Sequence, residues 1–307
     1  MTRALGLIGV PSSAGAITPG QEKGPAAVRA AGFVDLLRAA GCEVHDHGDL
    51  PIVRFQPDPA NRRRQNLAAV VSVARSLAEV VDRILGSGQV PIVVGGDCSV
   101  TVGAVSGFVR AGLDLSLLYV DGGVDLYVPG TQKMSHFDSM GVAHMLDEPG
   151  AALELSHLGP RWPLLDPRRV VFFGQGASST RAGDDLEDPE ARVFARHPFR
   201  AWPLSSVHGR PKVAAREARA AIESDGGTFL VHFDVDVLDF LDCPLADVPE
   251  EVGLTLDEAM VSLREFFGSP RCGGLVVTEI NPDHGDSAGA AVARFTRELA
   301  TALGRSP

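Results

Sequence analysis

Short runs of uniformly apolar residues recur along this 307-residue chain, and helix-like patterns lie between them. The runs span residues 5–10, 90–94, 115–120, 170–173, 229–233 and 274–277. A strand buried on both faces has this composition, whereas a strand with one solvated face alternates apolar and polar residues. Alternation of such strands with helices is typical of a sheet covered on both sides. We therefore predict an α/β fold: three-layer α/β/α with a mostly parallel central sheet.

Two segments carry the clearest helical signals. In residues 65–85 the apolar side chains recur at helical spacing, at Leu67, Val70, Val71, Ala74, Leu77, Val81 and Ile84. Gly86 and Gly88 end this pattern. Residues 25–39 predict a second helix.

Domain organisation follows from the spread of these elements. The length would allow about two domains of about 150 residues each. No linker, low-complexity tract or repeat divides the chain, and the polar segments 51–65 and 176–192, rich in Arg, Asp and Pro, fit surface insertions. We expect a single domain over residues 1–307.

Composition and charge exclude several classes of function. A hydrophobic content of 45% excludes a mainly disordered chain, and a net charge of −11 argues against a nucleic-acid partner. No apolar stretch reaches the roughly 18 residues of a membrane span, and the N-terminal run is too short for a signal peptide. The cysteines form no CxxC pair, which argues against a zinc finger or a disulfide framework: Cys42, Cys98, Cys243 and Cys272. We expect a cytoplasmic protein without membrane contact.

Chemically active residues directly follow four of the apolar runs. Ligands of open α/β sheets bind beyond the carboxyl ends of the strands, so these residues should meet at one edge of the sheet. We expect five carboxylates and one thiol there: Cys98, Asp121, Asp125, Asp234, Asp236 and Glu279.

Spacing alone leaves two interpretations of these acids open. A single Asp after a strand usually caps a helix or forms a turn. Four carboxylates at two neighbouring strand ends repel one another unless a cation lies between them, and Mn²⁺ or Mg²⁺ suits oxygen ligands. The pattern therefore predicts turn formers or a metal site, and does not separate the two.

The order of the motifs resembles the arginase/agmatinase (ureohydrolase) family. The motifs are Gly95-Gly96-Asp97-Cys98-Ser99, the segment 121–125, Asp234-Val235-Asp236-Val237-Leu238-Asp239 and Glu279-Ile280-Asn281-Pro282. The likeness extends to residues 6–15, Gly24-Pro25 and Gly48-Asp49-Leu50, so it runs nearly end to end. It implies the fold predicted above.

The resemblance implies hydrolysis of a guanidino compound by hydroxide that bridges two Mn²⁺ ions. It makes Asp121 and Asp234 the carboxylates that bridge both metals. Asp125 resembles a ligand of the first metal and Asp236 a ligand of the second. Glu279 resembles the catalytic carboxylate that pairs with the planar guanidinium of the substrate. A trimer or hexamer is common in the family.

The chain departs from the family at both metal-ligating histidines. Cys98 occupies the position of the first, and a thiolate ligand would shift the preference toward Zn²⁺ or Fe²⁺. Gly123 occupies the position of the second and offers no side chain. We therefore expect the second metal site to be weakened.

Departures in the surrounding loops concern the substrate. Asp138 falls near the family's proton-shuttling histidine, and we assign it a catalytic role beside Asp125 and Glu279. Ser178 and Ser179 fall near the family's paired acids that hold the amino-acid end of the substrate, and Tyr127 replaces an asparagine. Candidate substrate-binding residues are Tyr127, His136, Ser179 and Glu279.

Two further histidines have open roles. His232 shares the facing parity of Asp234 along the strand, so it is either a site residue or a hydrogen-bonded core residue. His284 either faces the site or caps a helix.

Three hypotheses about function follow. The first is a metal-dependent hydrolase of a linear guanidino or amidino C–N bond, acting on a modified arginine such as hydroxyarginine, whose leaving group needs less proton shuttling. The second is a catalytically impaired relative that binds a ligand or partner. The third is a Cys98-dependent hydrolase, because a thiol at a helix N-terminus is activated as a nucleophile.

Overall fold

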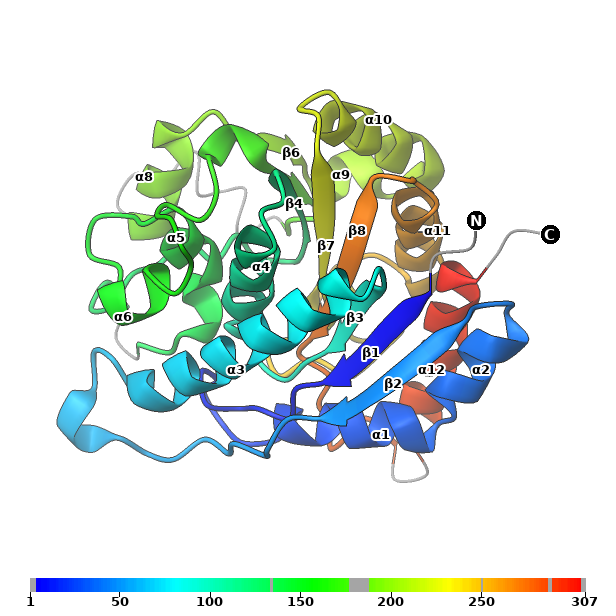
Figure 1. Ribbon diagram of the computed structural model, residues 1–307, viewed down its shortest axis with the longest axis horizontal. Coiled ribbons are helices and arrows are strands. Elements are labelled where there is room, and N and C mark those ends of the chain that lie inside the picture. The colour runs from blue at the N-terminus through cyan, green and yellow to red at the C-terminus, as the bar shows by residue number, and fades with distance from the viewer. Residues whose placement is uncertain (1–3, 133–134, 177–187, 250, 287–288, 305–307) are drawn as a thin grey trace.

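The protein is built around one eight-stranded sheet. The computed structural model describes residues 4–132, 135–176, 188–249, 251–286 and 289–304. All strand pairs are parallel, in the order β2-β1-β3-β8-β7-β4-β5-β6 (Figure 1). The strands are β1 (Leu5–Gly9), β2 (Val44–Asp49), β3 (Val90–Val94), β4 (Leu115–Val120), β5 (Val170–Phe173), β6 (Arg200–Trp202), β7 (Thr228–Asp234) and β8 (Cys272–Thr278).

Each of the six apolar runs forms a strand of this sheet. The strands β1, β3, β4 and β5 are buried along their whole length, which explains why their sequences lack alternation. The remaining strands, β2 and β6, lie at the two edges and consist of VHDHGD and RAW. Because an edge strand tolerates polar and exposed residues, these two carried no apolar signal.

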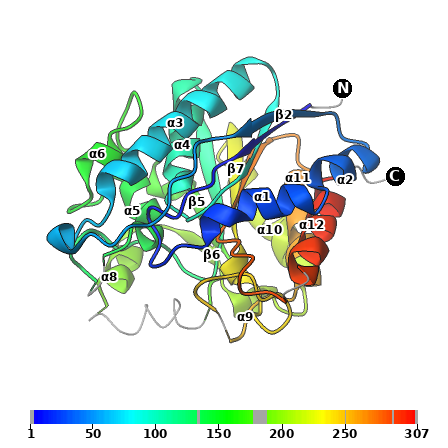
Figure 2. The ribbon, with the colours of Figure 1, turned by 90° about the horizontal axis from the view of Figure 1, so that it is seen from below.

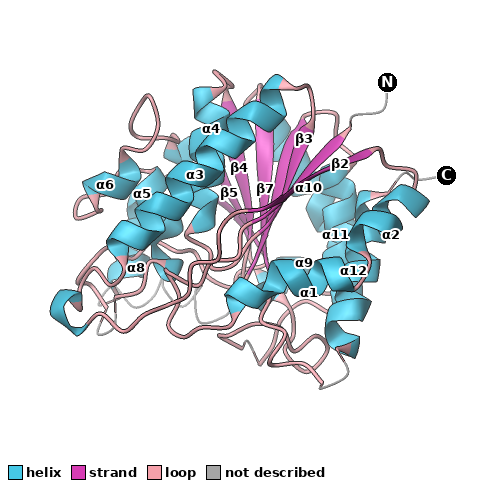
Figure 3. Ribbon diagram, turned by 60° about the horizontal axis from the view of Figure 1, so that its bottom comes forward, coloured by secondary structure: helices cyan, strands magenta, loops and turns pink. Residues whose placement is uncertain are grey.

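Helices cover both faces of the sheet and complete the three predicted layers (Figure 3). One face carries α3 (Leu67–Gly86), α4 (Val100–Arg110), α5 (Gly141–Met145), α6 (Leu153–Ser156) and α8 (Pro189–Arg196). The other carries α1 (Gly24–Ala30), α2 (Phe33–Ala39), α9 (Leu204–Val207), α10 (Pro211–Glu223), α11 (Leu256–Phe267) and α12 (Ala290–Leu303). Seen from below, α3 and α4 lie on one side of the strands and α1 and α12 on the other (Figure 2).

Two local predictions were wrong. Residues 25–39 form two helices, α1 and α2, because the chain breaks at Gly32, whose φ of 85° lies in the left-handed region. The segment 176–192 is not only a surface loop, since α8 begins at Pro189 behind the capping carboxylate of Asp188. Its residues 177–187 lie outside the described part of the chain.

The four strands that carry the motifs are the four central strands of the sheet. Val94 of β3 pairs with Val277 of β8, Val277 with Phe233 of β7, and Phe233 with Val120 of β4. These four residues form one row across the sheet, so the chain leaves each strand at the same level. The register therefore brings the motifs together. No helix in the described residues is long and apolar enough to cross a membrane.

Candidate functional site

The loop after β3 brings Cys98 to the sheet edge by passing close to another loop. At Gly96, an added Cβ atom would lie 1.5 Å from the backbone oxygen of Ser12, so only glycine fits. The carbonyl of Gly96 accepts a hydrogen bond of 2.8 Å from the amide of Glu279. This contact ties the ends of β3 and β8 together. Cys98 thereby lies directly before α4, with its side chain over the end of β7.

Two of the predicted site residues have left-handed backbone conformations. Asp125 has a φ of 50° and Glu279 a φ of 66°. Non-glycine residues rarely adopt such angles, and they do so where the surrounding structure forces a side chain into a required position. In both cases the carboxylate points into the interior, with 9% of Asp125 and 4% of Glu279 exposed.

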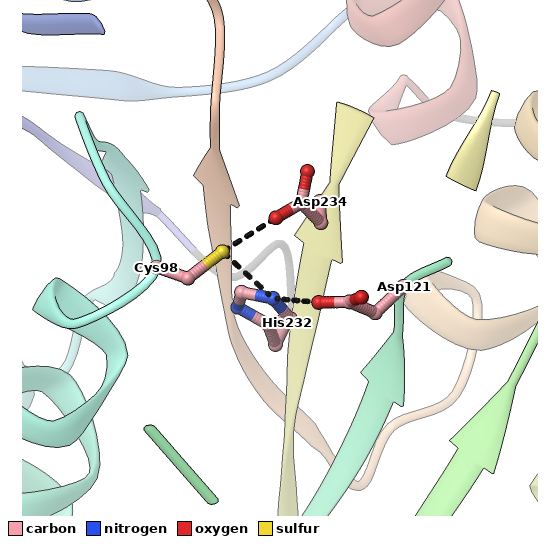
Figure 4. Close-up of side chains that lie close together, drawn as sticks. All are labelled: Cys98, Asp121, His232 and Asp234. Atoms are coloured by element: carbon pink, nitrogen blue, oxygen red, sulfur yellow. Dashed lines mark hydrogen bonds and ion pairs between the residues drawn. The ribbon is translucent and has the colours of Figure 1, made fainter. Parts of the chain in front are cut away.

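Cys98, Asp121, His232 and Asp234 form one buried cluster (Figure 4). The Cys98 thiol donates to Oδ2 of Asp234 and lies 3.7 Å from Nε2 of His232. The same Nε2 lies 3.2 Å from Oδ2 of Asp121. One ligand atom from each of the four residues lies within 4.8 Å of the others. The cluster thus contains a sulfur, a nitrogen and two carboxylate oxygens.

The imidazole of His232 is held from behind. Its Nδ1 lies 2.8 Å from Oγ1 of Thr101 in the first turn of α4. Its ring stacks on Tyr119, with centroids 3.9 Å apart and planes at 10°. Burial lowers the pKa of His232 to about 3, so the ring is neutral at pH 7. A neutral ring has a lone pair to offer.

A second group of acids lies beside this cluster. The Asp138 carboxylate accepts a 2.7 Å hydrogen bond from the amide of Cys98. Oxygens of Asp138 and Glu279 and the Cys98 sulfur lie within 4.8 Å of one another. Gln21 donates to Oε2 of Glu279 at 2.7 Å, while Oε1 of Glu279 is buried without a hydrogen-bond donor among the described residues. Tyr119 donates its hydroxyl hydrogen to Asp125.

Burial dominates the electrostatics of these carboxyl groups. Four of them have pKa values raised well above the usual range: Asp125, Asp138, Asp234 and Glu279. Loss of hydration on burial is the largest cause, and the charges of neighbouring carboxylates raise the pKa values further. Without a cation, burial and mutual repulsion therefore disfavour the charged forms of these groups. A metal ion or a cationic substrate would favour the charged forms.

The cluster opens into a cavity of about 280 Å³. Eight of the predicted site residues line it: Cys98, Asp125, Tyr127, His136, Asp138, Asp234, Asp236 and Glu279. Asp121 lies behind them, against His232. Ser179 lies outside the described residues. His284 is absent from the lining; it is 2.6 Å from Asp247 in a partly exposed ion pair.

Sequence reasoning missed several residues that surround the cavity. Gln21 and Tyr119 carried no signal, because Gln21 comes from a short 3-10 helix (Gln21–Lys23) far from the motifs in sequence and Tyr119 lies inside an apolar strand. Glu190 lines the cavity from the start of α8, within the segment interpreted as an insertion. For His232, strand parity correctly predicted a side chain on the same face as Asp234. The ring is also buried and lies within hydrogen-bond distance of Thr101, which agrees with the core interpretation as well.

The residues present fit one metal ion better than two. The Cys98 cluster supplies four donors, including a thiol and an imidazole, which suit a divalent transition metal. At Gly123, an added Cβ would lie 3.2 Å from Oδ1 of Asp121 and 3.7 Å from Oδ1 of Asp125. The backbone thus runs beside both carboxylates, but the glycine contributes no ligand atom.

Comparison with known proteins assigns the chain to a family. A family model described as arginase family matches residues 3–303. The chain belongs to the arginase family. It is 27% identical to arginase-1 of Homo sapiens over 305 residues, which cover 98% of this chain and 91% of that protein. Mitochondrial arginase-2 of Homo sapiens is 28% identical over 286 residues, covering 91% and 78%.

Solved structures share the fold. The arginase from Bacillus caldovelox has a TM-score of 0.86 at 23% identity, with 99% of both chains covered. The formimidoylglutamase from Bacillus subtilis has a TM-score of 0.71 at 16% identity, covering 99% of this chain and 89% of that one. The predicted resemblance and the predicted three-layer fold are both confirmed. Arginase-family proteins are metal-dependent hydrolases, so the expected metal chemistry agrees with the family.

Proposed function

We propose that this protein is a metal-dependent hydrolase that cleaves a C–N bond of a small linear guanidino compound. One observation carries the proposal: buried carboxylates, a thiol and an imidazole converge on one cavity at the centre of the sheet edge. No lysine or arginine lines that cavity in the described part of the chain. The site therefore suits a metal ion together with a cationic substrate.

The metal would be held by Cys98, Asp121 and Asp234, with Asp125 and Asp236 on the neighbouring side. Mn²⁺ is the family's ion, and the thiol of Cys98 adds preference for Zn²⁺ or Fe²⁺. A bound divalent ion supplies a nucleophile by lowering the pKa of water toward neutrality. The protein orients its own ligands: the amide of Asp236 donates to Oδ1 of Asp234 at 2.7 Å, and Tyr119 holds Asp125.

Glu279 binds the substrate guanidinium in this proposal. Gln21 fixes one carboxylate oxygen, which leaves Oε1 for a guanidinium N–H. Because both groups are planar, a carboxylate can orient a guanidinium through paired hydrogen bonds. Tyr127 and His136 line the same cavity and contact the rest of the substrate. Ser179, predicted for this role, lies outside the described residues.

Asp138 delivers the proton to the leaving amine. Burial and the charge of Asp97 raise the pKa of the Asp138 carboxyl, the direction that suits a group acting as an acid, while its hydrogen bond with Glu279 lowers it. When hydroxyurea is the product, the hydroxylated nitrogen stays on the guanidine carbon, so the departing alkyl amine is the same as for arginine and the same acid serves both substrates. We therefore propose hydroxyarginine as a substrate to test beside arginine and agmatine, and a trimer or hexamer as the state to test by light scattering.

A second candidate function is binding without turnover, and Gly123 favours it. Glycine offers no side-chain ligand beside Asp121 and Asp125, so a second metal ion would lack one donor there. The third hypothesis, a nucleophilic Cys98, has weaker support. Burial and the charge of Asp234 raise the pKa of the thiol well above its usual value, so the reactive thiolate is disfavoured without a metal.

Release of urea or hydroxyurea from the three substrates, measured with Mn²⁺, Zn²⁺ or Fe²⁺, tests the proposal. Glu279→Gln should lower kcat/KM by about 10–100-fold, the loss that corresponds to one charged hydrogen bond of about 1.5–3 kcal/mol. The control is Glu79→Gln on the exposed side of α3, which should keep wild-type activity. No turnover of any substrate with any of the metals would reject the hydrolase and favour binding alone.

A further inference from the structure

We infer that this chain holds one divalent ion in a four-donor site of Cys98, Asp121, His232 and Asp234. In this site the strand histidine His232 supplies the imidazole that positions 98 and 123 lack. The inference rests on the proposed metal dependence and adds the ligand set, the number of ions and the preferred metal.

The geometry of the cluster is that of a built site. All four residues are buried, with 3% of Cys98, 1% of Asp121, 0% of His232 and 2% of Asp234 exposed. Their donor atoms lie within 4.8 Å of one another although they come from the ends of three strands. Cys98 and Asp234 line the cavity, while Asp121 and His232 lie behind them. An ion among the four would form the floor of the cavity.

His232 is oriented as metal-bound histidines are. A histidine ligand usually donates its other ring N–H to a neighbouring acceptor, which fixes both the tautomer and the direction of the ring. Here Thr101 Oγ1 lies 2.8 Å from Nδ1, where it can accept the Nδ1 hydrogen when Nε2 binds an ion. Nε2 faces Cys98 and Asp121, and it would be the unprotonated atom in the metal-bound form. The stack on Tyr119 prevents the ring from rotating.

The position of His232 in the strand explains how it reaches the site. In β7 it lies two residues before Asp234, so both side chains project from the same face of the sheet. Its neighbour across the β4–β7 pair is Tyr119, which packs against the ring. A ligand on a central strand is more rigidly placed than one on a loop.

Neither Asp125 nor Asp236 belongs to a cluster of three or more close metal-donor atoms among the described residues. Asp125 accepts the hydroxyl hydrogen of Tyr119, and Oδ1 of Asp236 accepts the amide of Gly122 at 2.9 Å. Gly123, whose backbone runs beside Asp121 and Asp125, supplies no nitrogen ligand for a second ion. One ion is therefore the expected stoichiometry.

The donor set also selects the metal. A thiolate and an imidazole favour Zn²⁺, Co²⁺ or Fe²⁺ over Mn²⁺, which prefers oxygen ligands. The charges agree with this assignment. Cys98, Asp121 and Asp234 as anions exceed the charge of one divalent ion by a single negative charge, and a guanidinium in the cavity would neutralise that excess.

Cobalt substitution of the metal-stripped protein tests the inference without relying on activity. We expect one Co²⁺ per chain by elemental analysis, with a thiolate-to-cobalt charge-transfer band in the near ultraviolet. The band should vanish in Cys98→Ser and persist in Cys42→Ser, which alters a partly buried thiol outside the cluster. Two ions per wild-type chain, or a spectrum without the band, would overturn the inference.

Substitutions of His232 and of Thr101, which contacts its ring, test the role of the histidine. His232→Gln should weaken Co²⁺ binding at least tenfold, while His284→Gln, the matched control, should bind as the wild type does. Thr101→Val keeps the shape of the side chain and removes only the partner of Nδ1, so a loss of about tenfold is expected even if His232→Gln folds poorly. Wild-type affinity in a folded His232→Gln or Thr101→Val variant would contradict the inference.

Failure of the inference and failure of the proposed function give different results. One Co²⁺ per chain with the band, but no turnover of any guanidino substrate, would reject the hydrolase and support the metal site. Turnover with two Mn²⁺ per chain, unchanged by His232→Gln, would keep the hydrolase and reject the single-ion site.

Discussion

Replacing Glu190 by Gln should stabilise the metal-free protein, by an amount that grows with pH. The Glu190 carboxyl is buried, and its Oε1 accepts a 2.7 Å hydrogen bond from the amide of Leu126. Burial is the first cause that raises its pKa from 4.5 to about 8, and the charges of Asp188 and Asp121 add to it. A glutamine keeps the carbonyl acceptor and removes the titration.

The magnitude follows from the two pKa values. Below pH 4.5 the carboxyl is neutral in the folded and unfolded chain, so its contribution is constant. Above that pH the unfolded chain loses the proton and the folded chain keeps it until about pH 8, so the free energy of unfolding falls as pH rises. At about 1.4 kcal/mol per pH unit, this loss reaches roughly 3 kcal/mol at pH 7.

Urea denaturation of chelator-treated protein at several pH values between 5 and 8 measures the effect. Wild type and Glu190→Gln should have similar free energies of unfolding at pH 5, and the variant should gain about 1.4 kcal/mol over wild type for each further unit. Glu79→Gln, on the exposed side of α3, should show no such divergence. A constant difference between Glu190→Gln and wild type, or a difference that shrinks as pH rises, would refute the reasoning.

Three further perturbations probe the site and its support. Gly96→Ala should destabilise the protein by about 3 kcal/mol or more in urea denaturation, because the new Cβ would lie 1.5 Å from Ser12 O. A loss of less than about 1 kcal/mol, the lower limit for overpacking, would contradict this close approach. Tyr119→Phe keeps the stack on His232 but removes the donor to Asp125, so a loss of about 1–3 kcal/mol is expected in the same assay, and an unchanged midpoint would show that this hydrogen bond contributes nothing. Metal at about a hundred times its Kd should add about 2.7 kcal/mol to the stability of the stripped protein, visible as a higher Tm that chelator reverses; an unchanged Tm would mean that folded and unfolded chains bind the ion equally.

Most of the fold was predictable because its central strands are buried on both faces. That environment selects uninterrupted apolar runs, and every such run forms a strand of the sheet. The edge strands β2 and β6 were not predictable, since their polar residues are compatible with a loop. The break between α1 and α2 depends on the left-handed conformation of Gly32, which the apolar periodicity of the segment does not reveal.

The residues of the candidate site were likewise only partly predictable from the sequence. Cys98, Asp234 and Glu279 were found because each follows a predicted strand, and parallel strands place their ends at one edge. Gln21, Tyr119 and Glu190 were not found. Gln21 contacts Glu279 from a distant 3-10 helix, Tyr119 contacts Asp125 from within a strand, and Glu190 lines the cavity from the start of a helix. These contacts depend on how the chain folds, so no local sequence pattern predicts them.

The sequence by itself determined the fold class, the family and the order in which acids appear at strand ends. These are properties of composition and spacing along one chain. Only the tertiary structure decided that His232 faces Cys98 and Asp121, because that contact depends on the register of β4, β7 and β8. Strand parity allowed a core histidine or a ligand. Thr101, placed behind the ring by the packing of α4 on the sheet, contacts Nδ1 and so directs Nε2 toward Cys98 and Asp121.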